Sequence, residues 1–324
     1  MLVRSALALA AAAAVLAGPA QAKGTGLAFV TSEKDHTITV LDTKTLAVTE
    51  TLKTCKRPRH IQMLPGNEKF MVACGDSGKA DVIDVATRKS TGLVNIGEDP
   101  EAFDLSPDGQ TIYVSAEEDG ELVMYDMKGK KQKAVKVGKE PEGVKASPDG
   151  KTVWVTSEVA NMVHVYDVAS GKITHNVKVG NRPRRFALSP DGKELWVTNE
   201  LASAVTVLST VDYKILSTIE FQPPGMRKDD VTPVGITMTK DGKTVYVSLG
   251  KANHVAKVDA TARKIEGYTL VGKRAWNVTL TKDESRLFVV NGLSDDVTVV
   301  DLASNKAVKS VPVGRVPYGL LIDD

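Results

Sequence analysis

The sequence has little of several features that mark common classes of protein. Two cysteines in 324 residues are too few for a disulfide framework or a multi-cysteine zinc or iron–sulfur module. A formal net charge of only +2 lacks the concentrated positive field that nucleic-acid binding needs. No apolar run is long enough to span a membrane. We therefore expect neither a nucleic-acid partner nor a membrane span.

The most apolar segment lies at the N-terminus and resembles an export signal. Arg4 precedes an unbroken apolar run over residues 6–17, and residues 20–22 read Ala-Gln-Ala, a pattern of signal cleavage sites. We interpret residues 1–22 as a signal peptide that is removed, which leaves one domain over residues 23–324. The alanine-rich signal favours a Gram-negative bacterium, so we expect a soluble periplasmic protein.

Residues 23–324 contain a repeat. Seven variants of one string occur at spacings of 42, 42, 41, 42, 50 and 42 residues: FVTS (29–32), MVAC (71–74), YVSA (113–116), WVTS (154–157), WVTN (196–199), YVSL (246–249) and FVVN (288–291). An alternating apolar strand follows each string, and those strands end, at the same spacings, at Asp42, Asp84, Asp126, Asp167, Ser209, Asp259 and Asp301. A turn, SPDG or TKDG, precedes four of the strings.

Each repeat has room for four short strands. In residues 141–179, period-two alternation appears in four segments that are separated by turn residues, and helical periodicity is absent. A repeat of about 40–45 residues with four strands is typical of a propeller blade. We therefore predict an all-β, seven-bladed β-propeller. Residues 318–322 match the first strand of a blade and should pair with residues 27–32, closing the ring.

These strings and turns resemble the YVTN family of seven-bladed β-propellers over nearly all of the mature chain. The stretches GKEPEGVKASPDGKT, GNRPRRF and NGLSDDVTVVDLASNKAVKSVPVGRVPYG are similar to those of periplasmic propellers associated with PQQ-dependent alcohol catabolism. The resemblance implies a fold and a metabolic neighbourhood, and it assigns no reaction.

Loops that connect the fourth strand of one blade to the first strand of the next carry the variation between repeats. We align them on a proline and expect the following residue to lie at the mouth of the central channel. That ring, called the inner ring below, consists of Arg59, Glu101, Glu142, Arg184, Val234, Trp276 and Tyr318.

Arginines and aromatics in these loops predict a ligand site. A guanidinium pairs with carboxylates through two bonds, and aromatic rings stack on flat ligands. A planar polycarboxylate such as PQQ is therefore a candidate, with ordinary polar loop decoration as the alternative. The predicted ligand-binding residues are Arg57, Arg59, Glu101, Glu142, Arg182, Arg184, Arg274, Trp276, Arg315 and Tyr318.

Carboxylates gather on neighbouring loops. They suit a hard cation, which takes many oxygen ligands, or a positively charged partner such as a PQQ-dependent dehydrogenase or cytochrome c, and a solvated acidic face is the alternative. The group consists of Asp99, Glu101, Glu117, Glu118, Asp119, Glu140 and Glu142. PQQ and a metal ion are thus the candidate cofactors.

Cys55 and Cys74 should end on one face of the propeller, and in an oxidising compartment a disulfide is the favoured outcome. A soft-metal site that adds His60, and Asp76 with it, is the alternative. The longer spacing marks an insertion around residues 222–230, which we expect either to fold over the channel mouth or to be a surface excursion.

Evidence for catalysis is weak. The sequence has no G-x-S-x-G, H-E-x-x-H, Walker or Rossmann motif, and we assign no catalytic residue. A lactonase-like propeller hydrolase or lyase is the rival hypothesis, with His36, His60, Glu101 and His254 as its candidate groups. We favour a monomeric, non-enzymatic accessory protein that binds a small molecule or a redox partner.

Overall fold

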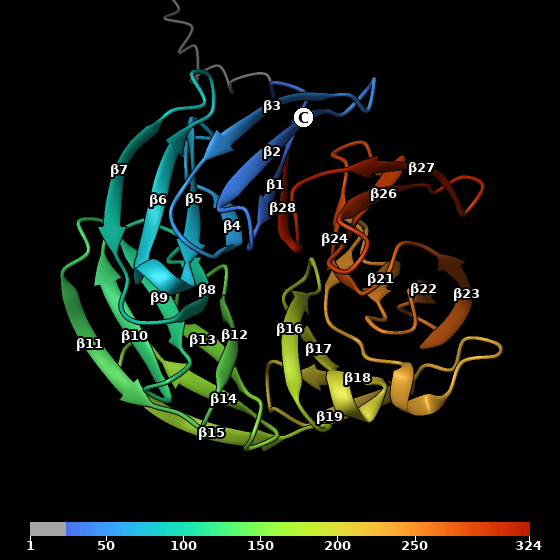
Figure 1. Cartoon of the computed structure of the whole chain (residues 1–324). Coiled ribbons are helices and arrows are strands. Elements are labelled where there is room, and N and C mark those ends of the chain that lie inside the picture. The colour runs from blue at the N-terminus through green and yellow to red at the C-terminus, as the bar shows by residue number, and fades with distance from the viewer. Residues whose placement is uncertain (1–23) are drawn as a thin grey trace, which may run out of the picture.

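Seven four-stranded antiparallel sheets surround a central axis in the computed structural model, which describes residues 24–324 (Figure 1). The predicted all-β, seven-bladed propeller is confirmed, and the predicted signal peptide lies outside the described residues. Within those residues, no helix has the length and apolar character that crossing a bilayer requires.

In each blade the four strands follow one another from the axis outward. The innermost strands are β4 (Pro58–Met63), β8 (Pro100–Leu105), β12 (Pro141–Ala146), β16 (Pro183–Leu188), β20 (Ile236–Met238), β24 (Ala275–Leu280) and β28 (Pro317–Asp323). The second strands, which carry the repeated strings, are β1 (Leu27–Ser32), β5 (Lys69–Cys74), β9 (Thr111–Ala116), β13 (Thr152–Ser157), β17 (Glu194–Asn199), β21 (Thr244–Ser248) and β25 (Arg286–Asn291).

The outer half of each blade is also regular. The third strands are β2 (Thr37–Asp42), β6 (Lys79–Asp84), β10 (Glu121–Asp126), β14 (Met162–Asp167), β18 (Ala204–Ser209), β22 (His254–Asp259) and β26 (Asp296–Asp301). The outermost strands are β3 (Val48–Lys53), β7 (Ser90–Asn95), β11 (Lys131–Lys136), β15 (Lys172–Lys178), β19 (Ile215–Glu220), β23 (Lys264–Leu270) and β27 (Lys306–Pro312). Three single 3-10 turns complete the elements: η1 (Gly75–Ser77), η2 (Glu200–Ala202) and η3 (Lys228–Asp230).

One blade is built from both ends of the chain. Strand β28 pairs antiparallel with β1, placing Val30 opposite Leu320 and Leu27 opposite Asp323. The backbone N–H of Gly26 donates to the Asp323 carbonyl at 2.7 Å, and Thr25 bonds to the Asp323 carboxylate. Strand β28 thus covers the inner edge of β1, and the predicted closure of the ring by the two ends of the chain is confirmed.

The hydrophobic core lies between the blades. Seven clusters fill the seven blade interfaces, and in one of them Phe29 of the first blade meets Phe70 of the next with ring centroids 4.6 Å apart. Because the second strands have a neighbouring blade on each side, they are buried on both faces, as in Thr152–Ser157. This explains why the repeated strings read as nearly continuous apolar runs.

The two ends of the propeller differ in their connections. We call the end that carries the loops between blades, together with the loops between second and third strands, the loop face. The SPDG turns lie at the other end, the hairpin face, where Gly150 adopts a φ of +70° that glycine tolerates without strain. The loop face is therefore where the repeats can vary.

The insertion packs on the rim of the propeller. The N–H of Gln222 donates to the Tyr268 hydroxyl at 3.0 Å, Lys228 pairs with Glu220 at 2.8 Å, and Met226 packs against the core between two blades. These contacts involve outer strands β19 and β23, so the insertion is a surface excursion rather than a cover over the channel.

The two cysteines are joined. Cys55, in the loop before β4, forms a disulfide with Cys74 at the end of β5, with Cα atoms 5.8 Å apart. No thiolate is left to bind a soft metal, and His60 instead packs edge-on against Phe103. The alternative metal site of Cys55, His60 and Cys74 is therefore not formed.

Removing this crosslink should lower stability without changing the fold. The bond closes a loop with a sequence separation of 19, for which chain entropy gives about 3 kcal/mol. We expect the double variant Cys55→Ala/Cys74→Ala to lose about this much free energy of unfolding in urea. Thiol titration of the denatured, unreduced wild type should find no free thiol, and two titratable thiols would contradict the assignment.

Candidate functional site on the loop face

A hydroxyl in the repeated string joins each blade to the next. In five repeats a serine or threonine donates a hydrogen bond of 2.8–2.9 Å to the backbone carbonyl of an inner-ring residue in the following blade. The pairs are Thr31 with Arg59, Ser115 with Glu142, Thr156 with Arg184, Thr198 with Val234, and Ser248 with Trp276. The inner ring is therefore held by the same residues that define the repeat.

Each of these hydroxyls also serves its own blade. The Thr156 oxygen accepts from the backbone N–H of Gly143 at 2.7 Å while the hydroxyl donates to Arg184. Ala73 and Val290 stand at this position in the two remaining repeats. The carbonyls of Glu101 and Tyr318 therefore have no such partner.

The residue two positions before the inner-ring residue has unusual backbone geometry in six of the seven repeats. Six non-glycine residues there have φ between 40° and 60°, a region that few such residues adopt. They are Arg57, Asp99, Glu140, Arg182, Arg274 and Val316. Side chains from the adjacent loop support some of these turns, as when Asn161 accepts from the N–H of Arg182 at 2.8 Å.

A second ring surrounds the first, and the sequence analysis missed it as a set. The residue directly after each repeated string is a glutamate in four repeats and a glycine in three: Glu33, Gly75, Glu117, Glu158, Glu200, Gly250 and Gly292. The glycines leave room for large neighbours, because a Cβ at Gly75 would overlap the Arg57 guanidinium and one at Gly292 the Trp276 indole. The sequence could have revealed this second ring, because its residues always stand directly after the repeated string and are always glutamate or glycine.

Arginines and carboxylates of the two rings interlock. We call this set the central cluster; it consists of Arg57, Arg59, Arg182, Arg184, Arg185 and Arg274 with Glu33, Asp99, Glu101, Glu142, Glu158 and Glu200. The structure thus brings together all the predicted ligand-binding residues except Arg315. That side chain is largely exposed and pairs with Asp35 at 2.6 Å on the rim.

Glu142 lies at the middle of the cluster. Its carboxylate contacts Arg184 at 3.2 Å and Arg185 at 2.9 Å, and it accepts from the Tyr318 hydroxyl at 3.1 Å. Burial opposes ionisation, but Arg184, Arg185 and Arg59 outweigh it and hold the pKa of Glu142 well below the ordinary value. Glu142 therefore stays charged at neutral pH.

Two further glutamates face the same arginines. Glu158 contacts Arg184 and lies 2.6 Å from Arg182, while Glu200 lies 2.8 Å from Arg274. Burial, reinforced by the charge of Glu142 and opposed by Arg184 and Arg182, raises the pKa of Glu158 to about 7. A carboxylate with this pKa exchanges its proton near neutral pH.

The other side of the cluster has carboxylates in excess. Arg57 contacts Asp99 and lies 3.1 Å from Asp76, and Arg59 contacts Glu101. Burial raises the pKa of Glu101 well above the ordinary value, the charge of Glu142 adds to this, and Arg59 opposes it.

Tyr318 and Trp276 close the loop-face end of the channel. The Tyr318 hydroxyl accepts a hydrogen bond from Arg185 at 2.6 Å and reaches Glu142, so β28 is bonded to strands on the far side of the axis. Trp276 lies 5.5 Å from Tyr318 between centroids and has the Arg274 guanidinium 4.3 Å from its ring. Further along the channel from these two aromatic side chains is a cavity of about 330 Å³, lined by His60, Asp104, Lys145 and Arg185 among others.

The three histidines considered for a hydrolase differ in their surroundings. Burial, with Arg185 adding to it, lowers the pKa of His60 to about 4, so its ring is neutral in the channel. His36 accepts from the Arg57 N–H, and His254 bonds to the Ala252 carbonyl at 2.6 Å. Of the three histidines considered for a hydrolase, His60 is thus buried and neutral in the channel, whereas His36 and His254 each use Nδ1 in a hydrogen bond.

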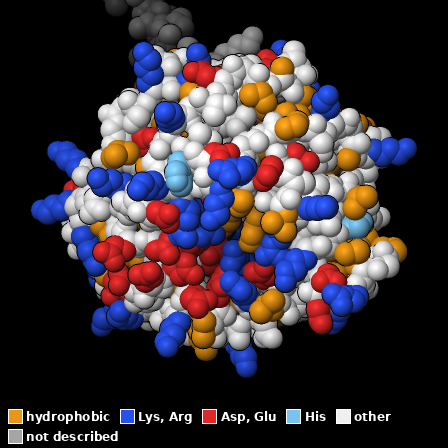
Figure 2. All heavy atoms as spheres, viewed as in Figure 1, with side chains coloured by type: hydrophobic (Ala, Val, Ile, Leu, Met, Phe, Trp, Pro, Cys, Tyr) orange, Lys and Arg blue, Asp and Glu red, His pale blue; other side chains and the backbone are white. Residues whose placement is uncertain are grey.

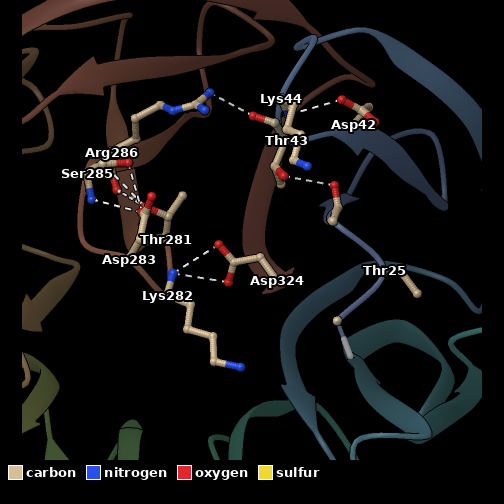
Figure 3. Close-up of a pocket in the computed structure, with 12 residues that line it drawn as sticks. Thr25, Asp42, Thr43, Lys44, Thr281, Lys282, Asp283, Ser285, Arg286 and Asp324 are labelled. Atoms are coloured by element: carbon tan, nitrogen blue, oxygen red, sulfur yellow. Dashed lines mark hydrogen bonds between the residues drawn. The ribbon is translucent and has the colours of Figure 1, made fainter. Parts of the chain in front are cut away.

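A cavity of about 890 Å³ lies where the blade closed by both termini meets the blade of β24–β27 (Figure 3). Its carboxylates serve local turns and backbone groups: Asp283 accepts from Thr281, and Asp324 accepts from the Lys282 N–H (Figure 3). This arrangement fits a structural seam better than a ligand site.

Exposed acids lie beside the central cluster. Figure 2 shows Asp and Glu side chains gathered next to a group of Lys and Arg near the centre of the face. We call the acidic quadrant the set Asp76, Glu98, Asp99, Glu117, Glu118, Asp119 and Glu140, most of which are exposed. These residues come from the loops of three adjacent blades.

Comparison with known proteins identifies relatives of this architecture. A family model described as YNCE-like beta-propeller matches residues 2–324. No functionally curated protein matches the sequence significantly.

Solved structures share the fold at low identity. Hydrazine synthase of Kuenenia stuttgartiensis is similar with a TM-score of 0.75 and 20% identity over 90% of this chain and 99% of that one. Periplasmic gluconolactonase of Pseudomonas aeruginosa has a TM-score of 0.77 and 20% identity over 92% and 99%. A functionally unknown protein from Desulfotomaculum acetoxidans has a TM-score of 0.77 and 18% identity over 92% and 99%. At these identities the likeness concerns the fold alone.

The bridging hydroxyl of Thr156 can be tested with two matched variants. Thr156→Val keeps the shape but leaves the Gly143 N–H and the Arg184 carbonyl without their partner, and burial of an unsatisfied group costs about 1–3 kcal/mol. We expect that loss in the free energy of unfolding, measured in urea, whereas Thr156→Ser should stay close to wild type. Equal losses in both variants would show that the hydroxyl does not matter.

Glu158 should make stability depend on pH. Its pKa of about 7 in the fold lies above the ordinary value of 4.5, so the folded state holds more protons between these values and stability falls as pH rises through them. Glu158→Gln should remove this component, which amounts to about 1.4 kcal/mol per unit of pKa difference. Unfolding free energies from pH 4.5 to 8 test this, with exposed Glu140→Gln as the control that should keep the wild-type slope.

Proposed function

For this chain, which belongs to the YNCE-like β-propeller family, we propose a non-enzymatic binding function. The protein docks a positively charged partner protein on its loop face. The proposed setting is PQQ-dependent alcohol oxidation in the periplasm, and the proposed partner is a PQQ-dependent dehydrogenase or a cytochrome c. The setting is supported by the resemblance of the loop sequences to the PQQ-associated propellers.

The observation that carries the proposal is the acidic quadrant. Glu98, Glu118, Asp119 and Glu140 are exposed, and none of their carboxylates is in an ion pair among residues 24–324. They lie on loops that the rigid blades hold in place. A cluster of fixed negative charge accelerates encounter with a basic surface and orients it.

Direct binding of PQQ has weaker support from the geometry. The arginines that were expected to meet its carboxylates already contact Glu101, Glu142, Glu158 or Glu200. A polycarboxylate would have to displace buried ion pairs, and leaving one charge without a partner costs several kcal/mol. The half-exposed Trp276, with Arg274 against its ring, is the remaining feature that suits a flat ligand.

A lactone hydrolase is a second candidate, favoured by one observation. Glu158 has a pKa of about 7 and lies beside Arg182 at a surface cavity of about 310 Å³. A carboxylate with such a pKa suits a general base, and a guanidinium can stabilise a developing oxyanion. Turnover of gluconolactone that is lost in Glu158→Gln would favour this function.

Partner docking is tested by the binding affinity, its dependence on salt concentration, and the effect of neutralising exposed carboxylates. The dehydrogenase and the cytochrome c from the same periplasm are each titrated against the protein at two ionic strengths. We expect one of them to bind, with an affinity that falls as salt rises, and at least tenfold more weakly when Glu98, Glu118 and Asp119 are changed to Gln, Gln and Asn.

A control with the same change in charge uses Glu50, Glu68 and Glu266, which lie on outer strands or the hairpin face, all changed to Gln. It should bind like the wild type. Equal weakening in both triple variants would mean that net charge, and not this surface, governs binding. PQQ is titrated in parallel: saturable quenching of fluorescence that Trp276→Phe abolishes would instead assign a small ligand to the centre.

A further inference from the structure

Two carboxylates of the acidic quadrant, Asp99 and Glu117, converge on one point with the buried carboxylate of Glu101 at the start of β8. Asp99 and Glu101 belong to the connection from β7 into β8, and Glu117 follows β9. One carboxylate oxygen from each lies within 4.8 Å of the other two, the spacing at which a single metal ion can be shared. Among residues 24–324 this is the only such group of three or more histidine, cysteine, aspartate or glutamate side chains.

Glu101 has an oxygen that lacks a protein partner. The residue is 1% exposed. Its recorded contacts with Arg59 and with Arg57 at 3.6 Å both involve Oε1, whereas Oε2 is buried and accepts no hydrogen bond from the described residues. A buried carboxylate oxygen without a partner is costly, so a positive group at this point would be strongly favoured.

The nearby arginines do not balance the negative charge around the Glu101 carboxylate. Around this point Arg57 and Arg59 are outnumbered by carboxylates, which are Asp76, Glu98, Asp99, Glu101, Glu117 and Glu118. At the middle of the central cluster, by contrast, Glu142 has two guanidiniums within 3.2 Å. The shortage of cations is thus specific to this quadrant.

We propose that Asp99, Glu101 and Glu117 form a binding site for a hard divalent cation of the calcium class. All three ligands are carboxylate oxygens, with neither nitrogen nor sulfur, and this set suits Ca²⁺ rather than a transition metal. Asp99 also lines a surface cavity of about 430 Å³ beside Asp76 and Glu98. That space admits the waters that complete a coordination number of six to eight.

The cation would act as a crosslink between two loops. The β7–β8 loop also carries the αL residue Asp99, whose φ is 40°, and Glu117 belongs to the neighbouring connection of the same blade. Binding would also reduce the negative charge of the acidic quadrant. The site rests on these contacts alone and stands whether or not a partner protein docks.

Calcium titration of the metal-free protein tests the site. The mature protein is stripped with chelator and titrated with Ca²⁺ by calorimetry, and its melting temperature is followed in parallel. We expect saturable one-to-one binding and a rise in melting temperature that grows with the logarithm of Ca²⁺ above the dissociation constant. Mg²⁺, which requires a tighter octahedral shell, should bind at least tenfold more weakly.

Neighbouring residues supply matched variants. Glu117→Gln should weaken Ca²⁺ binding at least tenfold, whereas Glu118→Gln, one residue further along and exposed, should change it less than twofold. Asp99→Asn and Glu98→Gln form a second pair with the same expectation, which keeps the test informative should one variant fail to fold.

Two results would overturn the proposal. The first is no heat and no thermal shift of the wild type at about 10 mM Ca²⁺, roughly tenfold above the dissociation constants of the weakest protein calcium sites; Glu101 and Glu117 would then share a proton instead. The second is equal weakening by Glu117→Gln and Glu118→Gln, because diffuse attraction to an acidic surface does not distinguish adjacent residues. Neither result bears on docking of a partner protein, which is measured separately.

Discussion

The hydroxyl bridge between blades, present in five of the seven repeats, is the contact on which the loop face depends. Thr156 and its equivalents bond to the inner strand of their own blade and to the first residues of the next blade. They therefore fix the backbone position of five of the seven inner-ring residues along the propeller axis. The same string that makes a buried strand also determines where Arg59, Glu142 and Arg184 stand.

Charges held at those positions form a closed network rather than an open pocket. Each arginine of the central cluster meets a carboxylate of the chain itself, and Tyr318 joins Arg185 and Glu142 across the axis. Replacing one member leaves its partner charged and buried, which is far more costly than losing a surface pair. The centre is thus rigid, and the exposed acids beside it are the groups free to meet something else.

The fold could be predicted from the sequence because three features share one period, and period and turn chemistry are local properties. The inner ring could be predicted because alignment on a proline is also local. The ion pairs between blades could not be predicted. Glu158 and Glu200 follow the repeated string, whereas Arg182 and Arg274, with which they pair, lie in the loops that connect one blade to the next. The sequence alone does not indicate that Arg184 meets a carboxylate 26 positions away, or Arg274 one 74 positions away, rather than solvent.

Closure by both termini has a consequence for how the chain reaches this structure. Strand β1 is made first but is paired on its inner side only by residues 317–323, which are made last. Until then its inner edge of backbone donors and acceptors is unpaired, and such edges recruit other strands. Contacts of such long sequence separation are slow to form. The nascent propeller is therefore an incomplete ring whose protection from self-association depends on rapid arrival of its final strand.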